Sequence, residues 1–228
     1  MQAAGTIAEL ILMDDLHAAR IICPSGLVPA PGQYLLAHEA GSYAPLATVI
    51  YPARPLADGM ISAPGVPGEW SPGTRLLLRG PLGHGFALPN SAARVALIAW
   101  DDGPRRLLAL LEPASRQNAS VTLVCENPPE DLPLQIEVLP LQALPEVLKW
   151  ADYAAFDVAR ESLAGLKNQL RARGTTAAGT QGQVLVRVPM PCGGLAQCGV
   201  CTVRTRAANN LACEAGPVFD LNLLDLES

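Results

Sequence analysis

Charged and aromatic side chains are scarce in this chain of 228 residues. Asp, Glu, Lys and Arg make up 16% of it, and Phe, Trp and Tyr make up 4%. So few aromatic rings disfavour a surface on which nucleic-acid bases stack. The formal net charge is −5 and the sequence contains no run of Lys or Arg, so we expect no nucleic-acid partner.

Long hydrophobic runs are also lacking. A membrane-spanning helix needs about 18 to 20 apolar residues in a row, whereas stretches such as 95–100 have only the length of a strand. Residues 1–15 contain three acidic side chains and no Lys or Arg, which is unlike a secretory signal. The sequence therefore predicts a cytoplasmic protein without a membrane span.

Histidine is rare as well. His17, His38 and His84 lie far apart in the sequence, and we assign none of them to a metal site. Ser, His and Asp show no spacing typical of a hydrolase, and no acid–base pair stands out. We therefore name no catalytic residue and expect the chemistry to reside in a bound cofactor.

The first 90 residues have the pattern of β structure. Short apolar stretches that contain β-branched residues alternate with turns that contain Pro and Gly, which is typical of a small antiparallel barrel. The expected strands are 6–13, 18–23, 33–37, 45–51 and 74–78.

From residue 91 onward, strands alternate with helices, which predicts a parallel sheet. The expected strands are 95–100, 121–125, 135–139, 152–158 and 183–188, and the expected helices are 104–111, 141–149 and 161–173. Residues 174–182 carry no charge and are rich in Gly, Thr and Ala, so we expect a flexible linker there. The predicted parts are a barrel (1–90), a reduced α/β domain (91–180) and a C-terminal lobe (181–228).

Four of the six cysteines fall within the last 37 residues: Cys192, Cys198, Cys201 and Cys213. Such a cluster in a reducing compartment indicates metal binding. Five residues separate the first two cysteines, two separate the next pair and eleven precede the last. A plant-type [2Fe–2S] site has the pattern C-x4-C-x2-C with a distant fourth cysteine, so the first gap here is one residue longer. We predict a [2Fe–2S] cluster on these four side chains.

A structural zinc ion is the alternative, since zinc also favours four cysteines. Zinc ribbons place their ligands as two separated C-x2-C pairs, but only Cys198 and Cys201 form such a pair here. Disulfides are a third possibility. Cys23 and Cys125 lie in apolar stretches, where we expect buried thiols.

Three motifs carry a family resemblance. Residues 213–219 read Cys-Glu-Ala-Gly-Pro-Val-Phe, residues 80–86 read Gly-Pro-Leu-Gly-His-Gly-Phe, and residues 31–34 read Pro-Gly-Gln-Tyr. In these motifs the chain resembles the electron-transfer subunit of class 1B dihydroorotate dehydrogenase, which belongs to the ferredoxin-reductase-like superfamily. In the family, the motif that corresponds to residues 80–86 reads Gly-Pro-Leu-Gly-Asn-Gly-Phe, and the motif that corresponds to residues 31–34 reads Pro-Gly-Gln-Phe.

The resemblance implies a flavin-binding barrel, a nucleotide-type α/β domain and a C-terminal [2Fe–2S] lobe. It also implies a partner, the catalytic dihydroorotate dehydrogenase flavoprotein of pyrimidine biosynthesis, and hence a hetero-oligomer. This chain would then be a non-catalytic subunit that relays electrons between that flavoprotein and an acceptor. Its apolar tail (217–219 and 221–224) either contacts the partner or packs on its own domain.

The nucleotide-type domain departs from the family. Where the family has a glycine-rich turn that approaches a pyrophosphate, this chain has Trp100, Asp101 and Asp102 before Gly103. Two carboxylates oppose a bound polyanion. The family's later Cys-Gly-Pro turn is matched by Phe-Asp-Val at 156–158. We therefore interpret this domain as degenerate and do not expect NAD to bind.

The flavin motif is altered too. The family's Arg-Pro-x-Ser strand aligns either with residues 54–57, which lack the Ser, or with residues 47–51, which lack the Arg. No Gly-Thr turn lies at the expected distance before Gly80. These changes leave FAD open as a cofactor. The alternative functions are an FAD-containing reductase with atypical flavin binding and a zinc-stabilised structural subunit.

Overall fold

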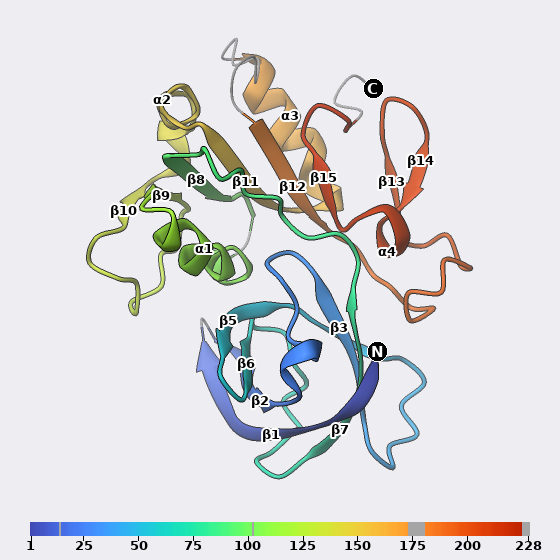
Figure 1. Ribbon diagram of the computed structural model, residues 1–228. Helices are drawn as coiled ribbons and strands as arrows, with labels where there is room; N and C mark the ends of the chain where they lie inside the picture. Colours follow the sequence, from blue (N-terminus) through green and yellow to red (C-terminus); the bar gives the residue numbers. More distant parts are fainter. Residues whose placement is uncertain (14, 102, 173–180, 225–228) are drawn as a thin grey trace.

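The computed structural model describes residues 1–13, 15–101, 103–172 and 181–224. The described residues contain two large sheets (Figure 1), an antiparallel sheet that curls around its own core and a mostly parallel sheet covered by helices, together with a two-stranded hairpin. The predicted combination of a β barrel with an α/β part is therefore confirmed. In the described part of the chain, no helix is long and apolar enough to cross a membrane.

The barrel sheet contains seven strands in the order β4-β3-β7-β1-β2-β6-β5. Alternate side chains of a strand point to opposite faces. Leu35 and Ala37 of β3 therefore join the barrel core, whereas Tyr34 and Leu36 join the core shared with the α/β part. The strands are β1 (Gln2–Met13), β2 (Leu16–Ile22), β3 (Tyr34–Glu39), β4 (Thr48–Ile50), β5 (Pro52–Leu56), β6 (Gly59–Ser62) and β7 (Arg75–Leu82), with a 3-10 turn, η1 (Ser25–Leu27).

The region after residue 45 differs from the prediction. Instead of one strand over 45–51, the chain forms the short strand β4 and then the antiparallel pair of β5 and β6. Proline lacks a backbone donor and disfavours central strands. Because of Pro52 and Pro55, the sequence pattern did not predict β5. This strand tolerates them because it lies at the edge of the sheet.

The second sheet has six strands in the order β10-β9-β8-β11-β12-β15, all parallel to their neighbours except β15. Helices α2 and α3 pack against one face of it, and α1 with the turn before it packs against the other. The strands are β8 (Arg94–Ala99), β9 (Ser120–Val124), β10 (Glu137–Leu139), β11 (Tyr153–Ala159), β12 (Gln181–Arg187) and β15 (Val218–Asp220). The helices are α1 (Leu111–Arg116), α2 (Leu144–Trp150) and α3 (Leu163–Ala172), with the 3-10 turns η4 (Leu141–Ala143) and η5 (Arg160–Ser162) before the last two.

Two predictions for this region are wrong in detail. The expected helix 104–111 consists of two 3-10 turns, η2 (Pro104–Arg106) and η3 (Leu108–Leu110), which precede α1. Side chains three apart lie on one face of a 3-10 turn, and Leu107 and Leu110 are both buried. The expected linker 174–182 is too long, because β12 already begins at Gln181. The rest of that linker lies outside the described residues.

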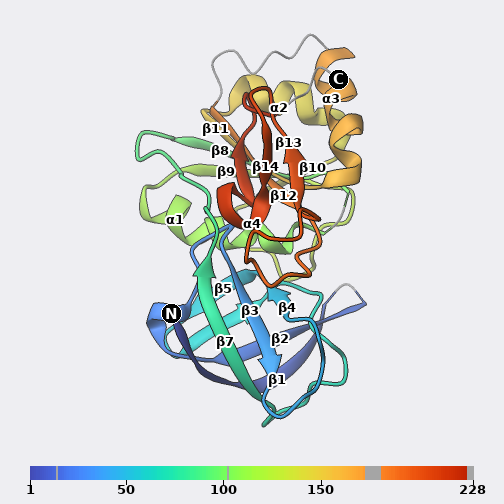
Figure 2. The same cartoon turned by 90° about the vertical axis from the view of Figure 1, so that its right-hand side faces the viewer.

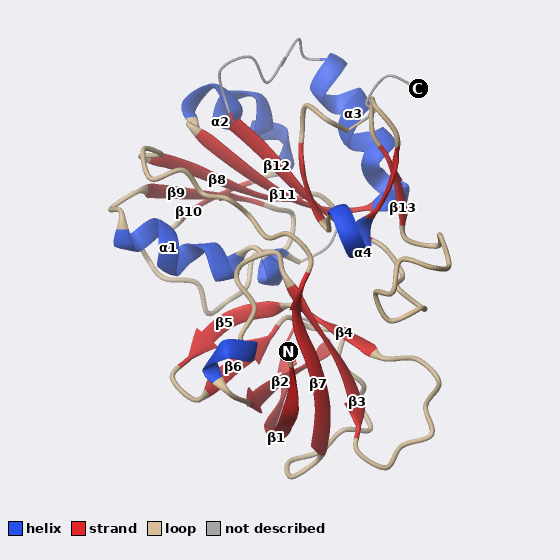
Figure 3. Ribbon diagram, turned by 45° about the vertical axis from the view of Figure 1, so that its right-hand side comes forward, coloured by secondary structure: helices blue, strands red, loops and turns tan. Residues whose placement is uncertain are grey.

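The cysteine-containing segment (188–217) is an excursion between β12 and β15, which are neighbours in the sheet. It contains a long loop, the hairpin of β13 (Thr202–Arg204) and β14 (Asn209–Leu211), and the short helix α4 (Ala212–Ala215). Figure 2 shows it lying against the α/β part, directly above the barrel. In Figure 3 its loop is the long tan connection beside α4.

Candidate functional site

The four predicted ligand cysteines come together as two pairs. Cys192 and Cys198 lie on the loop that follows β12, and the Cys198 side chain is hydrogen-bonded to Cys192. Cys201, just before β13, has its Sγ 3.4 Å from the Sγ of Cys213 on α4. Cys201 and Cys213 are buried, Cys192 is partly buried and Cys198 is exposed. Each pair offers two sulfur atoms, the type of donor that soft metals prefer.

The sulfur of Cys192 sits in a nest of backbone donors. The N–H groups of Leu195, Gln197 and Cys198 bond to it and lower the pKa of its thiol to about 6. The loop can turn this tightly because Gly193 and Gly194 have φ angles of +63° and +70°, a conformation that residues with a Cβ rarely adopt. The nest therefore favours a thiolate at this position.

The other pair has a different environment. Burial raises the pKa of the Cys213 thiol to about 11, and the hydrogen bond with Cys201 adds to this, while the Ala196 N–H opposes it. Without a bound cation, Cys213 is therefore held as a thiol. Among the described residues, no group of three or more His, Cys, Asp or Glu side chains is arranged to hold a metal ion.

The remaining two cysteines are separate from the site. Cys23 lies in the barrel core and Cys125 in the core beneath α1. Burial raises the pKa of both thiols, that of Cys125 to about 11. The prediction that both are buried thiols is confirmed.

The three motifs that carry the family resemblance contact one another, although they are far apart in the sequence. The Gln33 side chain donates to the Gly83 carbonyl (3.0 Å), which joins 31–34 to 80–86. The His84 N–H donates to the Gly216 carbonyl at 2.6 Å, which joins 80–86 to 213–219. The barrel and the cysteine-containing segment are therefore connected through these motifs.

Two barrel side chains hold the cysteine loop. The Tyr34 hydroxyl reaches the Cys213 carbonyl at 3.5 Å, and Arg79 on β7 donates a hydrogen bond to the Gly193 carbonyl. A Cβ at Gly194 would lie 3.1 Å from the Tyr34 hydroxyl oxygen, so the loop approaches the barrel closely. Burial, followed by the nearby Cys213 sulfur, raises the pKa of Tyr34 to about 12. Tyr34 therefore remains a neutral phenol beside the cysteines.

An ion network lies at the carboxyl ends of the parallel strands β8, β11 and β12, with Asp157 buried at its centre. The Asp157 carboxylate accepts from Arg106 Nε at 2.8 Å and from Arg187 Nε at 2.7 Å. Arg187 also pairs with Asp101, whose carboxylate accepts from the Ala159 N–H at 3.0 Å. Asp101 and Asp157 are thus both used for internal pairing. Asp102, the other acidic residue of the loop after β8, lies outside the described residues.

Sequence reasoning missed this network. Its members come from three separate segments (101–106, β11 and β12), so spacing could not reveal their contact. The sequence nevertheless contained a signal of this network, because Asp157 is the one charged residue in the otherwise apolar strand β11. A carboxylate in a strand that is buried on both faces requires a cationic partner.

The tail of the chain packs on its own domain. Val218, Phe219, Leu221 and Leu224 are each at most 6% exposed. The sequence left open whether the tail contacts a partner or packs on its own domain. These four side chains pack on their own domain.

The comparisons with known proteins are informative for structure only. No protein-family model matches the chain, and no curated protein matches it in sequence. Among solved structures, one described as the NADH-dependent reduced ferredoxin-NADP oxidoreductase, studied for flavin-based electron bifurcation, aligns with a TM-score of 0.72 at 17% identity. That alignment covers 99% of this chain and 91% of the other.

Two further structures are similar over most of the chain. The ferredoxin reductase in carbazole 1,9a-dioxygenase has a TM-score of 0.58 at 16% identity, with 81% of this chain and 68% of that one covered. The ferredoxin-NADP+ reductase from Plasmodium falciparum has a TM-score of 0.56 at 11% identity, with 75% and 90% covered. This chain therefore has the fold of the ferredoxin reductases.

Proposed function

We propose that this chain is an electron-transfer subunit that relays single electrons through a [2Fe–2S] cluster held by Cys192, Cys198, Cys201 and Cys213. The observation that carries the proposal is the division of these cysteines into two thiol pairs within one segment. A [2Fe–2S] cluster takes two protein ligands on each of its two irons. In this scheme Cys192 and Cys198 hold one iron, and Cys201 and Cys213 hold the other.

The surroundings of the cysteines support a cluster. Backbone N–H groups directed at Cys192 stabilise negative charge on sulfur, and such hydrogen bonds tune the potential of iron–sulfur clusters. Cys201 and Cys213 are screened from water. When bound, the cluster would supply one-electron chemistry, and the chain's own residues would set its exposure and its hydrogen bonding.

The proposed partner is a dihydroorotate dehydrogenase-like catalytic flavoprotein. The resemblance in motifs 31–34, 80–86 and 213–219 favours it, and these motifs contact one another. Beside the cysteines, Leu195 and Val200 are 54% and 42% exposed. Exposed apolar side chains around a redox centre suit a protein interface. We propose that the cluster lobe (181–228) docks there.

The absence of NAD binding is also part of the proposal, although the comparisons give it no support, since the similar structures include NAD(P)-dependent reductases. Its basis is the ion network at the sheet edge, in which Arg106 and Arg187 are already paired with Asp157 and Asp101. Their charge is therefore balanced internally and is not directed at a pyrophosphate.

A reductase that itself binds FAD is the second candidate, and the shared fold favours it, because similar structures include an FAD- and NAD-binding domain. Flavin absorbance in the purified protein distinguishes this candidate from a subunit that carries only a cluster. A colourless protein that contains zinc after anaerobic purification would instead indicate the zinc-stabilised structural subunit.

The cluster is tested by metal analysis of anaerobically purified protein. We expect about two irons and two sulfides per chain, with the paramagnetic signal of a one-electron centre on reduction. Cys198→Ser and Cys201→Ser should lower the iron content and weaken that signal. Cys125→Ser is the matched control, because Cys125 is a buried thiol outside the site. Zinc in place of iron, or iron loss in the control, would overturn the assignment.

The partnership is tested by co-expression with the catalytic flavoprotein. We expect co-elution in size-exclusion chromatography, with a permanent interface of roughly 2,000 Å² or more, and reduction of the cluster by dihydroorotate. Separate elution together with a cluster that dihydroorotate leaves oxidised would contradict the partnership.

A further inference from the structure

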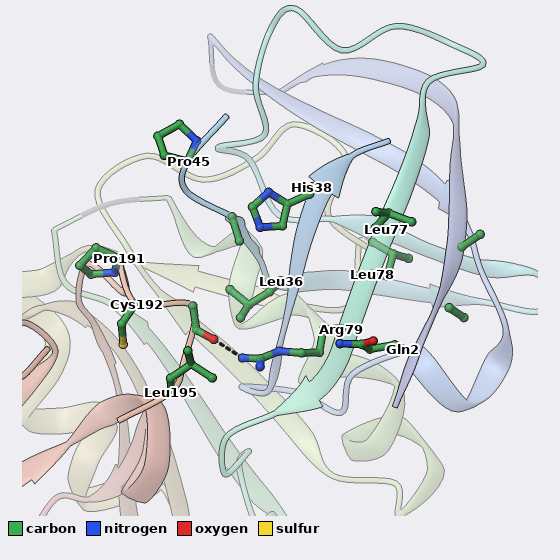
Figure 4. Close-up of a pocket in the computed structure, with 14 residues that line it drawn as sticks. Gln2, Leu36, His38, Pro45, Leu77, Leu78, Arg79, Pro191, Cys192 and Leu195 are labelled. Carbon is green, nitrogen blue, oxygen red and sulfur yellow. Dashed lines mark hydrogen bonds between the residues drawn. The ribbon is translucent and has the colours of Figure 1, made fainter. Parts of the chain in front are cut away.

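A cavity of about 700 Å³ lies between the barrel and the cysteine loop. One wall consists of side chains from β1, β3 and β7, and the opposite wall is the loop from Pro191 to Leu195 (Figure 4). This volume is within the usual range for small-molecule sites. The cavity is separate from the ion network, since neither Asp157 nor its two arginine partners line it.

The lining of the cavity combines apolar surface with hydrogen-bond donors. Leu36, Leu78 and Pro191 contribute apolar surface, while Arg79, His38 and Gln2 contribute hydrogen-bond donors. None of the described residues that line the cavity carries a carboxylate. The His38 ring is partly buried, and its side chain is an available donor. Such a site suits a flat, mostly apolar ring whose oxygen atoms accept hydrogen bonds.

The cavity shares a wall with the proposed cluster site. Cys192 and Gly193 line it, and Figure 4 shows the hydrogen bond from Arg79 to the Gly193 carbonyl on this wall. A molecule in the cavity would therefore lie against the loop that carries a proposed iron ligand. A cationic side chain at this position also offers a charge-assisted hydrogen bond to an oxygen acceptor of the occupant.

We propose that this cavity binds a quinone, and that the quinone accepts the electrons that pass through the cluster. The inference rests on the proposed function and specifies its acceptor by chemical class. The His38 and Arg79 N–H groups would donate to the quinone oxygens, and Leu36 and Leu78 would pack on the ring. A flavin dinucleotide fits less well, because its diphosphate needs several cationic partners, whereas Arg79 is the one Arg or Lys among the described residues that line the cavity.

The electron balance of the step is as follows. The reduced flavin of the partner subunit would give up two electrons and two protons; the electrons would pass singly through the cluster and the protons would leave to solvent. One quinone takes up both electrons and two protons from solvent and becomes one hydroquinone. No bond to the protein forms or breaks.

Binding of duroquinone to the anaerobic full-length protein, measured by isothermal titration calorimetry, tests the proposal. All ring carbons of this quinone are substituted, so it does not add to cysteine thiols. We expect one molecule per chain. Ala4→Trp should weaken binding by about tenfold or more, because the exposed Ala4 lines the cavity and a Trp there occupies it. Ala207→Trp is the matched control, exposed and outside the lining.

A second variant covers the case in which Ala4→Trp fails to fold. His38→Leu keeps the approximate side-chain size and removes one donor, so binding should weaken by about 2- to 10-fold. No measurable duroquinone binding, equal binding by wild type and folded Ala4→Trp, or displacement of duroquinone by FMN would each overturn the proposal.

Metal analysis and duroquinone titration of the same samples distinguish a failure of this inference from a failure of the proposed function. If iron and sulfide are present but duroquinone does not bind, the quinone site is wrong and the electron relay stands. If duroquinone binds as expected but iron is missing, the cavity is a quinone site and its role as acceptor for a cluster is refuted.

Discussion

Removing the Asp157 carboxylate should destabilise the protein strongly. Its side chain is 1% exposed and bonds to both Arg106 and Arg187, and the Arg106 side chain is itself only 10% exposed. The change Asp157→Asn removes the buried counter-charge that Arg106 and Arg187 share, while Arg187 retains its pairing with Asp101. Breaking a buried ion pair on one side costs about 3–5 kcal/mol. For a chain of this size, that loss corresponds to a fall in Tm of about 6–20 °C.

The matched control is Asp58→Asn. Asp58 pairs with Arg20 at 2.6 Å, but the two side chains are 50% and 35% exposed, so its loss should cost less than about 1 kcal/mol. Urea unfolding of both variants, followed by circular dichroism, measures the difference. Equal, small losses for the two variants would refute the view that the network is a buried, water-excluded unit. A double-mutant cycle with Arg106→Met should show coupling of about 0.5–3 kcal/mol.

Two further predictions concern the site and its electron donor. Gly194→Ala should lower both iron content and Tm more than Gly199→Ala. Both residues have φ near +70°, but only the Cβ at 194 meets the Tyr34 hydroxyl, whereas nothing lies within 4 Å of the Cβ at 199; equal losses would contradict the close approach. NADH should leave the cluster oxidised in stopped-flow mixing, because Asp101 and Asp157 occupy the sheet edge, and rapid bleaching in protein free of contaminating reductase would contradict that expectation.

The sequence predicted the sheets well because both depend on hydrophobic patterns along single segments. Residues 95–100 are a continuous apolar run and residues 152–158 are apolar apart from Asp152 and Asp157, and these stretches became the central strands β8 and β11. The prediction failed where local chemistry conflicts with the structure, as in β5, whose prolines disfavour a strand, and in residues 104–111, where 3-10 turns replace a helix.

The candidate site was predictable in part. Spacing predicted that Cys192, Cys198, Cys201 and Cys213 act together, but not that Cys192 lies among backbone donors while Cys213 is buried. Those environments depend on Tyr34 and Arg79, which come from the opposite end of the chain. The cavity beside Cys192 is likewise formed by segments that have no relation in the sequence.

The contact between Tyr34 and Cys213 also determines when the site can form during folding. The two residues are separated by 179 positions, and contacts between such distant parts of a chain are slow to form. Both large sheets can build their cores first from strands that are closer together in the sequence. The cysteine loop therefore acquires its final shape late, and metal loading would follow synthesis of nearly the whole chain. An excised C-terminal fragment would lack the barrel side chains that hold the loop.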